Sequence, residues 1–224
     1  MRKADVVQKP RFITFEGGEG AGKSTLLGNL VSRLEAAGGT VAKTREPGGT
    51  PLAERLRSAL FHVDPSETSP SVYTEALVIS AARRDHVDHF IRPALGKGHW
   101  VLCDRFTDST RAYQGGALED TVVETLEALA TDGLKPGLTF LLDADPKDLL
   151  ARRQERGGPT DIFERRPMSF HEEVRQRFLA LARCFPERIV VLNALQTPEE
   201  LAAEAMSVLD RVYGLSEDMK RAGL

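Results

Sequence analysis

The segment GGEGAGKS at residues 17–24 decides the fold class of this chain. It matches the pattern GxxxxGK[ST], whose glycines let backbone N–H groups turn inward around a polyphosphate. At that spacing Lys23 reaches the outer phosphates, and the hydroxyl group of Ser24 can bind Mg²⁺. Residues 17–25 are therefore predicted to form a phosphate-binding loop.

The sequence on either side of the loop supports this prediction. Residues 11–15 (RFITF) are typical of a strand, and residues 25–37 have the apolar spacing of a helix. The motif works between a strand and a helix N-terminus, because the helix end adds partial positive charge toward the same anion. The alternative, a chance glycine-rich turn, does not explain why the strand and the helix both fall in register with the motif.

Short β-branched runs alternate with helical patterns through the rest of the chain. Further strands are expected at residues 41–44, 99–103, 138–142 and 189–192, and helices at residues 52–61, 71–95, 120–131, 146–155, 169–184 and 198–213. This alternation predicts an α/β fold of the P-loop NTPase type, a three-layer sandwich in which helices flank a five-stranded parallel sheet. No linker interrupts the pattern, so a single domain over residues 1–224 is expected.

The composition argues against several classes of function. A net charge of -3 over 224 residues lacks the basic surplus of a nucleic-acid-binding protein. No apolar run is long enough to cross a membrane, and the first residues lack the apolar stretch of a signal peptide. The two cysteines, Cys103 and Cys184, make no CxxC pair and suit reduced thiols. We therefore expect a cytoplasmic protein with no nucleic-acid or membrane partner.

A carboxylate and an arginine follow the strand expected at residues 99–103. The carboxyl ends of parallel strands meet at one edge of a sheet, so Asp104 is expected to face Lys23 and to share a Mg²⁺ ion with Ser24. Arg105 could hold the phosphate of an acceptor, because phosphoryl transfer depends on positioning and on neutralising the charge of the moving group. A surface ion pair is the alternative interpretation of Asp104 and Arg105.

Two further features point to a second substrate. The loop at residues 45–51 follows the second strand, and Pro47 and its glycines fix a tight turn that places Arg45 to meet an acceptor phosphate. A plain connecting turn is the alternative. Glu19 within the phosphate-binding loop is unusual, because a bound polyphosphate repels a carboxylate beside it.

Several segments of the chain, in order, resemble thymidylate kinases over nearly its whole length. They are FEGGEGAGKST (residues 15–25), TREPGGT (44–50), AAR (81–83), CDRFTDSTRAYQGG (103–116) and the arginine-rich stretch 152–164. Their order and spacing are far more specific than the phosphate-binding loop alone. The resemblance implies an enzyme of dTTP biosynthesis that transfers the γ-phosphate of ATP directly to dTMP with Mg²⁺. It also implies a homodimer that uses the helix before Arg83.

The resemblance assigns an acceptor pocket as well. Glu19 then contacts the acceptor sugar, the loop with Arg45 and Pro47 helps to hold dTMP, and Arg83 hydrogen-bonds the thymine base. Ile79 stands four positions before Arg83, where the family usually carries an aromatic residue that stacks on the base. Further groups that line this pocket are expected from Arg105, Ser109, Thr110, Tyr113 and Gln114. A place in the core is the alternative for Tyr113.

The resemblance also predicts the source of a catalytic arginine. One branch of the family carries it at the position of Gly20, and the other, bacterial-type branch supplies it from a lid. A lid is expected at about residues 152–167, where Arg152, Arg153 and Arg156 precede the sequence GGP. Either Arg153 or Arg156 would reach the γ-phosphate, and a solvated basic helix end is the alternative. Asn193, after the last strand, is expected to border the adenine of ATP.

The sequence thus yields a defined set of candidate residues for a kinase. The catalytic candidates are Lys23, Asp104, Arg105, Arg153 and Arg156. The candidates for binding ATP are Gly17, Gly18, Glu19, Gly20, Ala21, Gly22, Lys23, Ser24, Thr25 and Asn193. Another nucleotide or nucleoside kinase is the near alternative, favoured by Ile79. A P-loop ATPase or switch protein is the more distant one, and Arg45, Arg83 and Arg105 argue against it.

Overall fold

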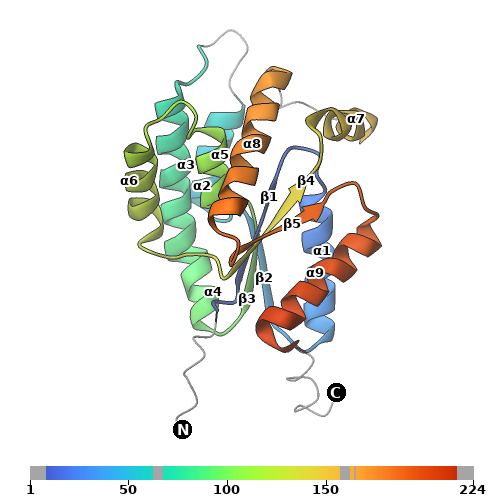
Figure 1. Cartoon of the computed structure of the whole chain (residues 1–224). Helices are drawn as coiled ribbons and strands as arrows, with labels where there is room; N and C mark the ends of the chain where they lie inside the picture. Colours follow the sequence, from blue (N-terminus) through green and yellow to red (C-terminus); the bar gives the residue numbers. More distant parts are fainter. Residues whose placement is uncertain (1–8, 63–67, 157–161, 164, 216–224) are drawn as a thin grey trace.

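A computed structural model describes residues 9–62, 68–156, 162–163 and 165–215 of the chain (Figure 1). The strands are β1 (Phe12–Gly17), β2 (Val41–Arg45), β3 (Trp100–Asp104), β4 (Leu138–Asp143) and β5 (Ile189–Asn193). They form one parallel sheet in the order β2-β3-β1-β4-β5. All the strands expected from the sequence are confirmed, with small differences at their ends.

Helices cover both faces of this sheet. They are α1 (Lys23–Ala36), α2 (Pro51–Phe61), α3 (Val72–His86), α4 (Arg92–Gly96), α5 (Thr107–Tyr113), α6 (Asp120–Thr131), α7 (Pro146–Arg156), α8 (Met168–Cys184) and α9 (Pro198–Tyr213). In Figure 1, α1 and α9 lie on one side of the sheet, and α3, α5 and α8 lie on the other. The predicted α/β fold with three layers is confirmed.

The core lies on both faces of the central strand β1. Side chains alternate between the two faces of a strand, so Ile13 and Phe15 pack into the cluster that contains α1 and α9. Phe12 points to the other face, where its ring lies 4.9 Å from the ring of Phe106. Glu16 follows on that second face and is fully buried, so the strand carries a carboxyl group into the interior just before the phosphate-binding loop.

The register of the strands brings several chain segments to one edge of the sheet. β1 pairs with β3 so that Phe15 lies beside Asp104, and β2 pairs with β3 so that Arg45 also lies beside Asp104. On the other side of β1, Gly17 lies beside Leu142 of β4. The residues that follow β1, β2 and β3 therefore meet at the carboxyl edge, where parallel sheets bind ligands.

Two helical segments differ from the expectation. The helix expected at residues 71–95 is present, but a π-helical turn, Val87–Ile91, separates α3 from α4. Pro93 follows this turn, and its ring has no N–H group and disfavours regular helical bonding to the preceding turn. The sequence does not predict α5, because TDSTRAY lacks an apolar helical repeat and buries polar groups such as Asp108 instead.

The described residues also bear on membrane helices and on the two cysteines. No helix in that part of the chain is both long enough and apolar enough to cross a membrane. Cys103 is buried and Cys184 is exposed, and both are free thiols.

Candidate active site

The phosphate-binding loop joins β1 to α1 in a conformation that depends on its glycines. Gly17, Gly20 and Gly22 have φ values of 133°, 82° and 89°, which residues with side chains rarely adopt. α1 begins at Lys23, so the unpaired N–H groups of its first turn face the loop. An anion that enters this loop therefore meets the positive end of a helix.

Lys23 is the buried cation of the loop. Its Nζ atom donates to the carbonyl oxygens of Gly17 and Gly18, at 3.2 and 2.9 Å. Burial lowers the pKa of Lys23 and the charge of Arg105 lowers it further, while the carboxylate of Glu19 acts in the opposite direction. An ammonium group held by neutral carbonyl oxygens gains strong, charge-assisted hydrogen bonds when phosphate oxygens replace them.

Ser24 and Asp104 come together beside this lysine. The hydroxyl group of Ser24 donates to Oδ2 of Asp104 at 2.7 Å, because Asp104 ends the strand next to β1. Mg²⁺ takes oxygen ligands, and it usually binds through one or two protein groups together with substrate phosphates and water. The hydroxyl and carboxylate oxygens of this pair fit such an ion at the entrance of the loop.

Arg105 links the phosphate-binding loop to α5. Its guanidinium group forms an ion pair with Glu19 and donates to Ser109 at 3.0 Å and to the hydroxyl group of Tyr113 at 3.2 Å. Its φ of 70° is uncommon for a residue with a side chain. Burial alone would raise the pKa of Glu19, but the charges of Arg105 and Lys23 outweigh it and lower the pKa to about 2. Glu19 is therefore ionised at neutral pH and offsets part of the positive charge of Arg105 and Lys23.

Glu16, which the sequence analysis does not single out, anchors the same region from inside the protein. Its carboxylate accepts hydrogen bonds from the N–H group of Phe106 at 2.8 Å and from the hydroxyl group of Ser109 at 2.6 Å. Burial, followed by the nearby charge of Asp108, raises the pKa of Glu16 from 4.5 to about 7. Because Ser109 also contacts Arg105, the position of that arginine depends on Glu16.

Replacing Glu16 with glutamine is expected to reduce the pH dependence of stability. A carboxyl group whose folded pKa of about 7 exceeds its ordinary value of 4.5 binds its proton more tightly in the folded chain. Its stabilising contribution is complete below about pH 4.5 and is lost as the pH rises through about 7. Between about pH 5 and 8, the unfolding free energy of the wild type should fall by roughly 1–3 kcal/mol more than that of Glu16→Gln.

Denaturant unfolding at a series of pH values measures this difference. Glu172→Gln, on the exposed surface of α8, is the control and should follow the wild type. Parallel curves for the wild type and Glu16→Gln would mean that Glu16 titrates with an ordinary pKa.

A pocket of about 280 Å³ opens beside the phosphate-binding loop, and we call it the acceptor pocket. Its lining includes every acceptor residue expected from the sequence: Glu19, Arg45, Pro47, Ile79, Arg83, Arg105, Ser109, Thr110, Tyr113 and Gln114. Lys23, Ser24, Thr25 and Asp104 line the same pocket, so a ligand in it reaches the phosphate-binding loop.

Arg83 is fixed in the wall of the acceptor pocket by buried partners. Its Nε atom donates to Glu46 at 2.6 Å, and its other nitrogens donate to Thr110 at 2.9 Å and to the carbonyl oxygen of Phe106 at 3.0 Å. His86 lies 3.0 Å from the second oxygen of Glu46. A guanidinium group has five N–H donors, so these bonds leave donors for a ligand.

The same buried network contains a group of potential metal ligands. Glu46, His86 and Cys103 offer atoms that lie within 4.8 Å of one another. The charge of Arg83 already neutralises Glu46, and burial raises the pKa of the Cys103 thiol well above its ordinary value. A metal ion needs a thiolate and an unpaired carboxylate, so this group fits a structural network better than a metal site.

Two arginines from different elements line the acceptor pocket near Pro47. Arg45, at the end of β2, is about half exposed and pairs with Glu54 at 2.8 Å. Arg57, from α2, donates to the carbonyl oxygen of Pro47 at 3.2 Å. The sequence predicts Arg45 but not Arg57, which belongs to no motif.

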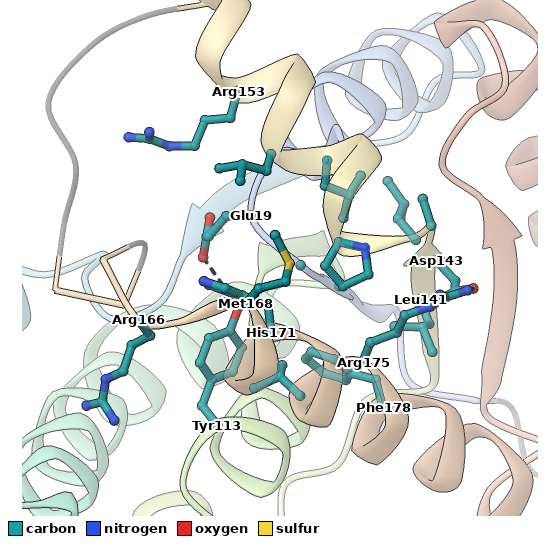
Figure 2. Close-up of a pocket in the computed structure, with 18 residues that line it drawn as sticks. Glu19, Tyr113, Leu141, Asp143, Arg153, Arg166, Met168, His171, Arg175 and Phe178 are labelled. Carbon is teal, nitrogen blue, oxygen red and sulfur yellow. Dashed lines mark hydrogen bonds and ion pairs between the residues drawn. The ribbon is translucent and has the colours of Figure 1, made fainter.

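A second pocket, of about 210 Å³, lies on the other side of Glu19 and Tyr113 (Figure 2). The ends of β1 and β4 enclose it together with α7 and α8, and apolar side chains such as Leu141 and Phe178 line it. Arg153 lines it from α7. Figure 2 shows Arg153 and Glu19 on the same side of this pocket. The two pockets therefore meet at Glu19, within the phosphate-binding loop.

The loop has no room for a side chain at Gly20. A Cβ atom there would lie 2.6 Å from the carbonyl oxygen of Leu149 and 3.7 Å from Cβ of Arg153. α7 thus crosses the loop and brings Arg153 next to the position where the loop itself carries no arginine. The side chain of Arg156 lies outside the described residues, as do residues 157–161 and 164 of the lid expected at 152–167.

The side chains of two residues that are expected to bind ATP line neither pocket. Ala21 is buried and packs into the core. Asn193 lines neither pocket, and its side-chain oxygen accepts a hydrogen bond from the N–H group of Leu195 at 2.9 Å. Arg152 donates to the carbonyl oxygens of residues 194 and 195, at 2.6 and 3.2 Å, and so ties α7 to the loop after β5.

The residues that the sequence analysis misses have weak or no local signals. They are Glu16, Glu46, Arg57, Phe61 and Phe163. Glu16 does carry a signal, because a carboxylate within an otherwise apolar, buried strand needs partners. Glu46 follows β2 directly, and nothing in the sequence indicates that its carboxylate is buried. Phe61 and Phe163 stand at a helix end and in a connecting segment, where an aromatic residue predicts nothing by itself.

A phosphate-binding loop that opens onto an arginine-lined pocket defines a class of protein. It is a P-loop nucleotide-binding protein that brings a polyphosphate and a second ligand together at the carboxyl edge of its sheet. The family model for thymidylate kinase matches residues 15–205. This chain belongs to the thymidylate kinase family, as its sequence segments predict.

Individual relatives agree with this assignment. The chain is 47% identical over 195 residues to a thymidylate kinase of Magnetococcus marinus, which covers 86% of this chain and 92% of the relative. It is 45% identical over 206 residues to a thymidylate kinase of Caulobacter vibrioides, covering 91% and 98%. A crystal structure of thymidylate kinase from Ehrlichia chaffeensis matches with a TM-score of 0.71 at 33% identity, over 88% of this chain and 97% of that one.

Proposed function

We propose that this protein transfers the γ-phosphate of ATP to dTMP and forms ADP and dTDP, a step toward dTTP. The acceptor pocket carries the proposal, because every residue expected for the acceptor lines one space that opens onto Lys23 and Ser24. A P-loop protein that only hydrolyses ATP has no use for Arg83 and Arg105 in a second ligand pocket. Membership of the thymidylate kinase family supports the choice of dTMP.

On the donor side, the phosphates of ATP occupy the loop of residues 17–24. Lys23 exchanges the carbonyl oxygens of Gly17 and Gly18 for phosphate oxygens. Ser24 and Asp104 hold Mg²⁺, which neutralises charge on the donor phosphates when it is bound. The positive end of α1 adds to this neutralisation.

On the acceptor side, Arg105 and Arg45 bind the phosphate of dTMP, and Arg83 with Gln114 contacts the base. The attacking group is already an anionic phosphate oxygen, so the transfer requires no general base. Glu19, whose pKa is about 2, stays ionised, so it can accept a hydrogen bond from the sugar hydroxyl and also hold Arg105 in place.

Arg153 supplies the positive charge that the loop lacks at Gly20. Its Cβ atom lies next to the loop because α7 packs across Gly20. An arginine that meets the transferring group stabilises the charge spread over its oxygens. The segment of residues 152–167 then works as the lid that carries this arginine, within one P-loop domain over residues 1–224.

An assay coupled to ADP formation tests the proposal with ATP, Mg²⁺ and a panel of nucleoside monophosphates. The rate should depend on the acceptor and should be highest with dTMP. Release of phosphate without an acceptor would contradict a kinase. A preference for dCMP, dUMP or AMP would contradict a thymidylate kinase and favour another nucleotide kinase.

We further propose that the protein works as a homodimer through α3. Tyr73 and Leu77 are 52% and 57% exposed, and with the exposed Ala81 they form one stripe at helical spacing. A stripe of large apolar side chains on a helix surface is typical of an interface between subunits. The free thiols of Cys103 and Cys184 suit a reducing compartment such as the cytoplasm.

Leu77→Glu is expected to convert the dimer into monomers. The substitution places a charge in the middle of the stripe, where a second copy would have to desolvate it. Sedimentation should give the mass of two chains for the wild type and of one chain for Leu77→Glu. Leu195→Glu, at an exposed position outside α3, is the control and should remain a dimer. A monomeric wild type would contradict this proposal.

A further inference from the structure

The acceptor pocket has a polar wall and an aromatic wall. Arg83 and Gln114 contribute polar groups. Two phenyl rings line it elsewhere, from Phe61 at the end of α2 and from Phe163 in the chain between α7 and α8. Ile79 lines the same pocket with an aliphatic side chain. The phenyl rings of this pocket therefore lie outside α3, where Ile79 occupies the position at which the family usually carries an aromatic residue.

Neighbouring groups hold both rings in place. The ring centroids of Phe61 and Phe163 lie 5.3 Å apart, with an interplanar angle of 60°. Phe163 also meets Tyr113 edge to face at 5.6 Å, and it is only 5% exposed. The guanidinium group of Arg57 lies 4.3 Å from the centroid of Phe61. Rings that are fixed in this way lose little freedom when a ligand binds.

We propose that Phe163, with Phe61 beside it, is the aromatic contact of the acceptor base in this protein. This inference rests on the proposed function, because it requires a nucleotide base in the acceptor pocket. A base presents a flat π-face, and stacking on an aromatic side chain contributes about 1–3 kcal/mol per base. An aliphatic side chain such as that of Ile79 packs against a base but does not provide this stacking.

Phe163 also connects the acceptor pocket to the second pocket. The carbonyl oxygen of Phe163 accepts a hydrogen bond from the N–H group of Arg166 at 3.1 Å. Arg166 forms an ion pair with the buried carboxylate of Glu75, and Glu75 accepts a hydrogen bond from the amide of Gln114 at 3.3 Å. Phe163 and Gln114 both line the acceptor pocket, while Arg153 and Arg166 line the second pocket (Figure 2). Contacts through Arg166 and Glu75 therefore join the acceptor pocket to the second pocket, which Gly17 and Gly18 of the phosphate-binding loop also line, so we expect a base in the acceptor pocket to affect binding at that loop.

Calorimetric titration of the full chain with dTMP tests both parts of the proposal. Phe61→Leu and Phe163→Leu each remove a ring but keep an apolar side chain in place. Each should weaken dTMP binding about tenfold. The titration is repeated with Mg²⁺ and a non-hydrolysable ATP analogue, whose effect on the dTMP affinity measures the coupling between the two sites. Only Phe163→Leu should reduce this coupling, because the guanidinium group of Arg166 lies 5.7 Å from the centroid of the Phe163 ring, whereas the Phe61 ring meets Arg57 instead.

Two variants serve as controls. Phe170→Leu changes a ring that lies 6.0 Å from Tyr113 in the same aromatic cluster but lines neither pocket, so it should bind dTMP like the wild type. Phe163→Tyr keeps the ring and should also bind like the wild type. Wild-type affinity in Phe163→Leu, or an equal loss in Phe170→Leu, would overturn the role in base binding. Unchanged coupling in Phe163→Leu would overturn the link between the two pockets.

The outcome for the wild type separates this inference from the proposed function. A wild type that neither binds nor phosphorylates dTMP contradicts the proposed function. A wild type that does both, with Phe163→Leu behaving identically, leaves that function intact and contradicts only the role of Phe163. Thermal melting checks the fold of each variant, and Phe163→Met replaces Phe163→Leu if that chain unfolds.

Discussion

The Lys23→Met variant is expected to lose phosphoryl transfer by about a thousandfold in kcat while it keeps its fold. The ammonium group of Lys23 lies at the junction of the phosphate-binding loop and the acceptor pocket, within hydrogen-bonding distance of the carbonyl oxygens of Gly17 and Gly18. Removing it leaves the charge that develops on the transferred group without the buried cation of the phosphate-binding loop. Methionine has a similar length, and replacing a desolvated charge by an apolar group does not weaken the core.

Steady-state kinetics with saturating ATP and dTMP, together with thermal melting, measure both parts of this result. Lys97→Met, at an exposed position after α4, is the matched control and should behave like the wild type. A kcat of Lys23→Met within tenfold of the wild type would contradict the placement of the donor phosphates in this loop.

The Arg153→Ala variant is expected to lose about a thousandfold in kcat with little change in the KM for dTMP. The reason is that Gly20 leaves the loop without its own arginine, and α7 brings Arg153 to that place. An interaction made mainly in the transition state lowers kcat rather than ground-state binding. Arg153 does not line the acceptor pocket, so dTMP should still bind.

Two arginines provide controls for this variant. Arg183→Ala, at the exposed end of α8, should match the wild type. Arg152→Ala removes the hydrogen bonds between α7 and the loop after β5, so it should raise the KM for ATP more than it lowers kcat. An unchanged kcat in Arg153→Ala would contradict this assignment and transfer the catalytic role to Arg156.

The sheet and the phosphate-binding loop were predictable because their signals are local. The strands β1, β3, β4 and β5 are short runs rich in apolar residues, and Gly17, Gly20 and Gly22 have backbone angles that few other residues adopt. The meeting of Ser24 with Asp104 also follows from a general rule, because carboxyl ends of parallel strands share one edge.

Other parts of the site depend on packing between segments that are distant in the sequence. Phe61 and Phe163 become neighbours only because α2 and the chain after α7 meet at the acceptor pocket. α5 lacks an apolar repeat, and the buried carboxylate of Glu16 holds its beginning through Phe106 and Ser109. No local sequence pattern predicts such contacts.

The absence of a side chain at Gly20 has a physical reason that the sequence does not contain. The resemblance to other kinases predicts that a loop without an arginine relies on one from elsewhere. The structure adds that the carbonyl oxygen of Leu149 occupies the space a side chain would need. The same helix that excludes an arginine from the loop carries Arg153.

The fate of the γ-phosphate of ATP tests the central proposal most directly. ATP labelled at that position is incubated with the wild-type chain, Mg²⁺ and an equal amount of dTMP, and the products are separated and counted. The label should appear in the β-phosphate of dTDP, with one dTDP formed for each ADP. Label released as inorganic phosphate whether or not dTMP is present would contradict it.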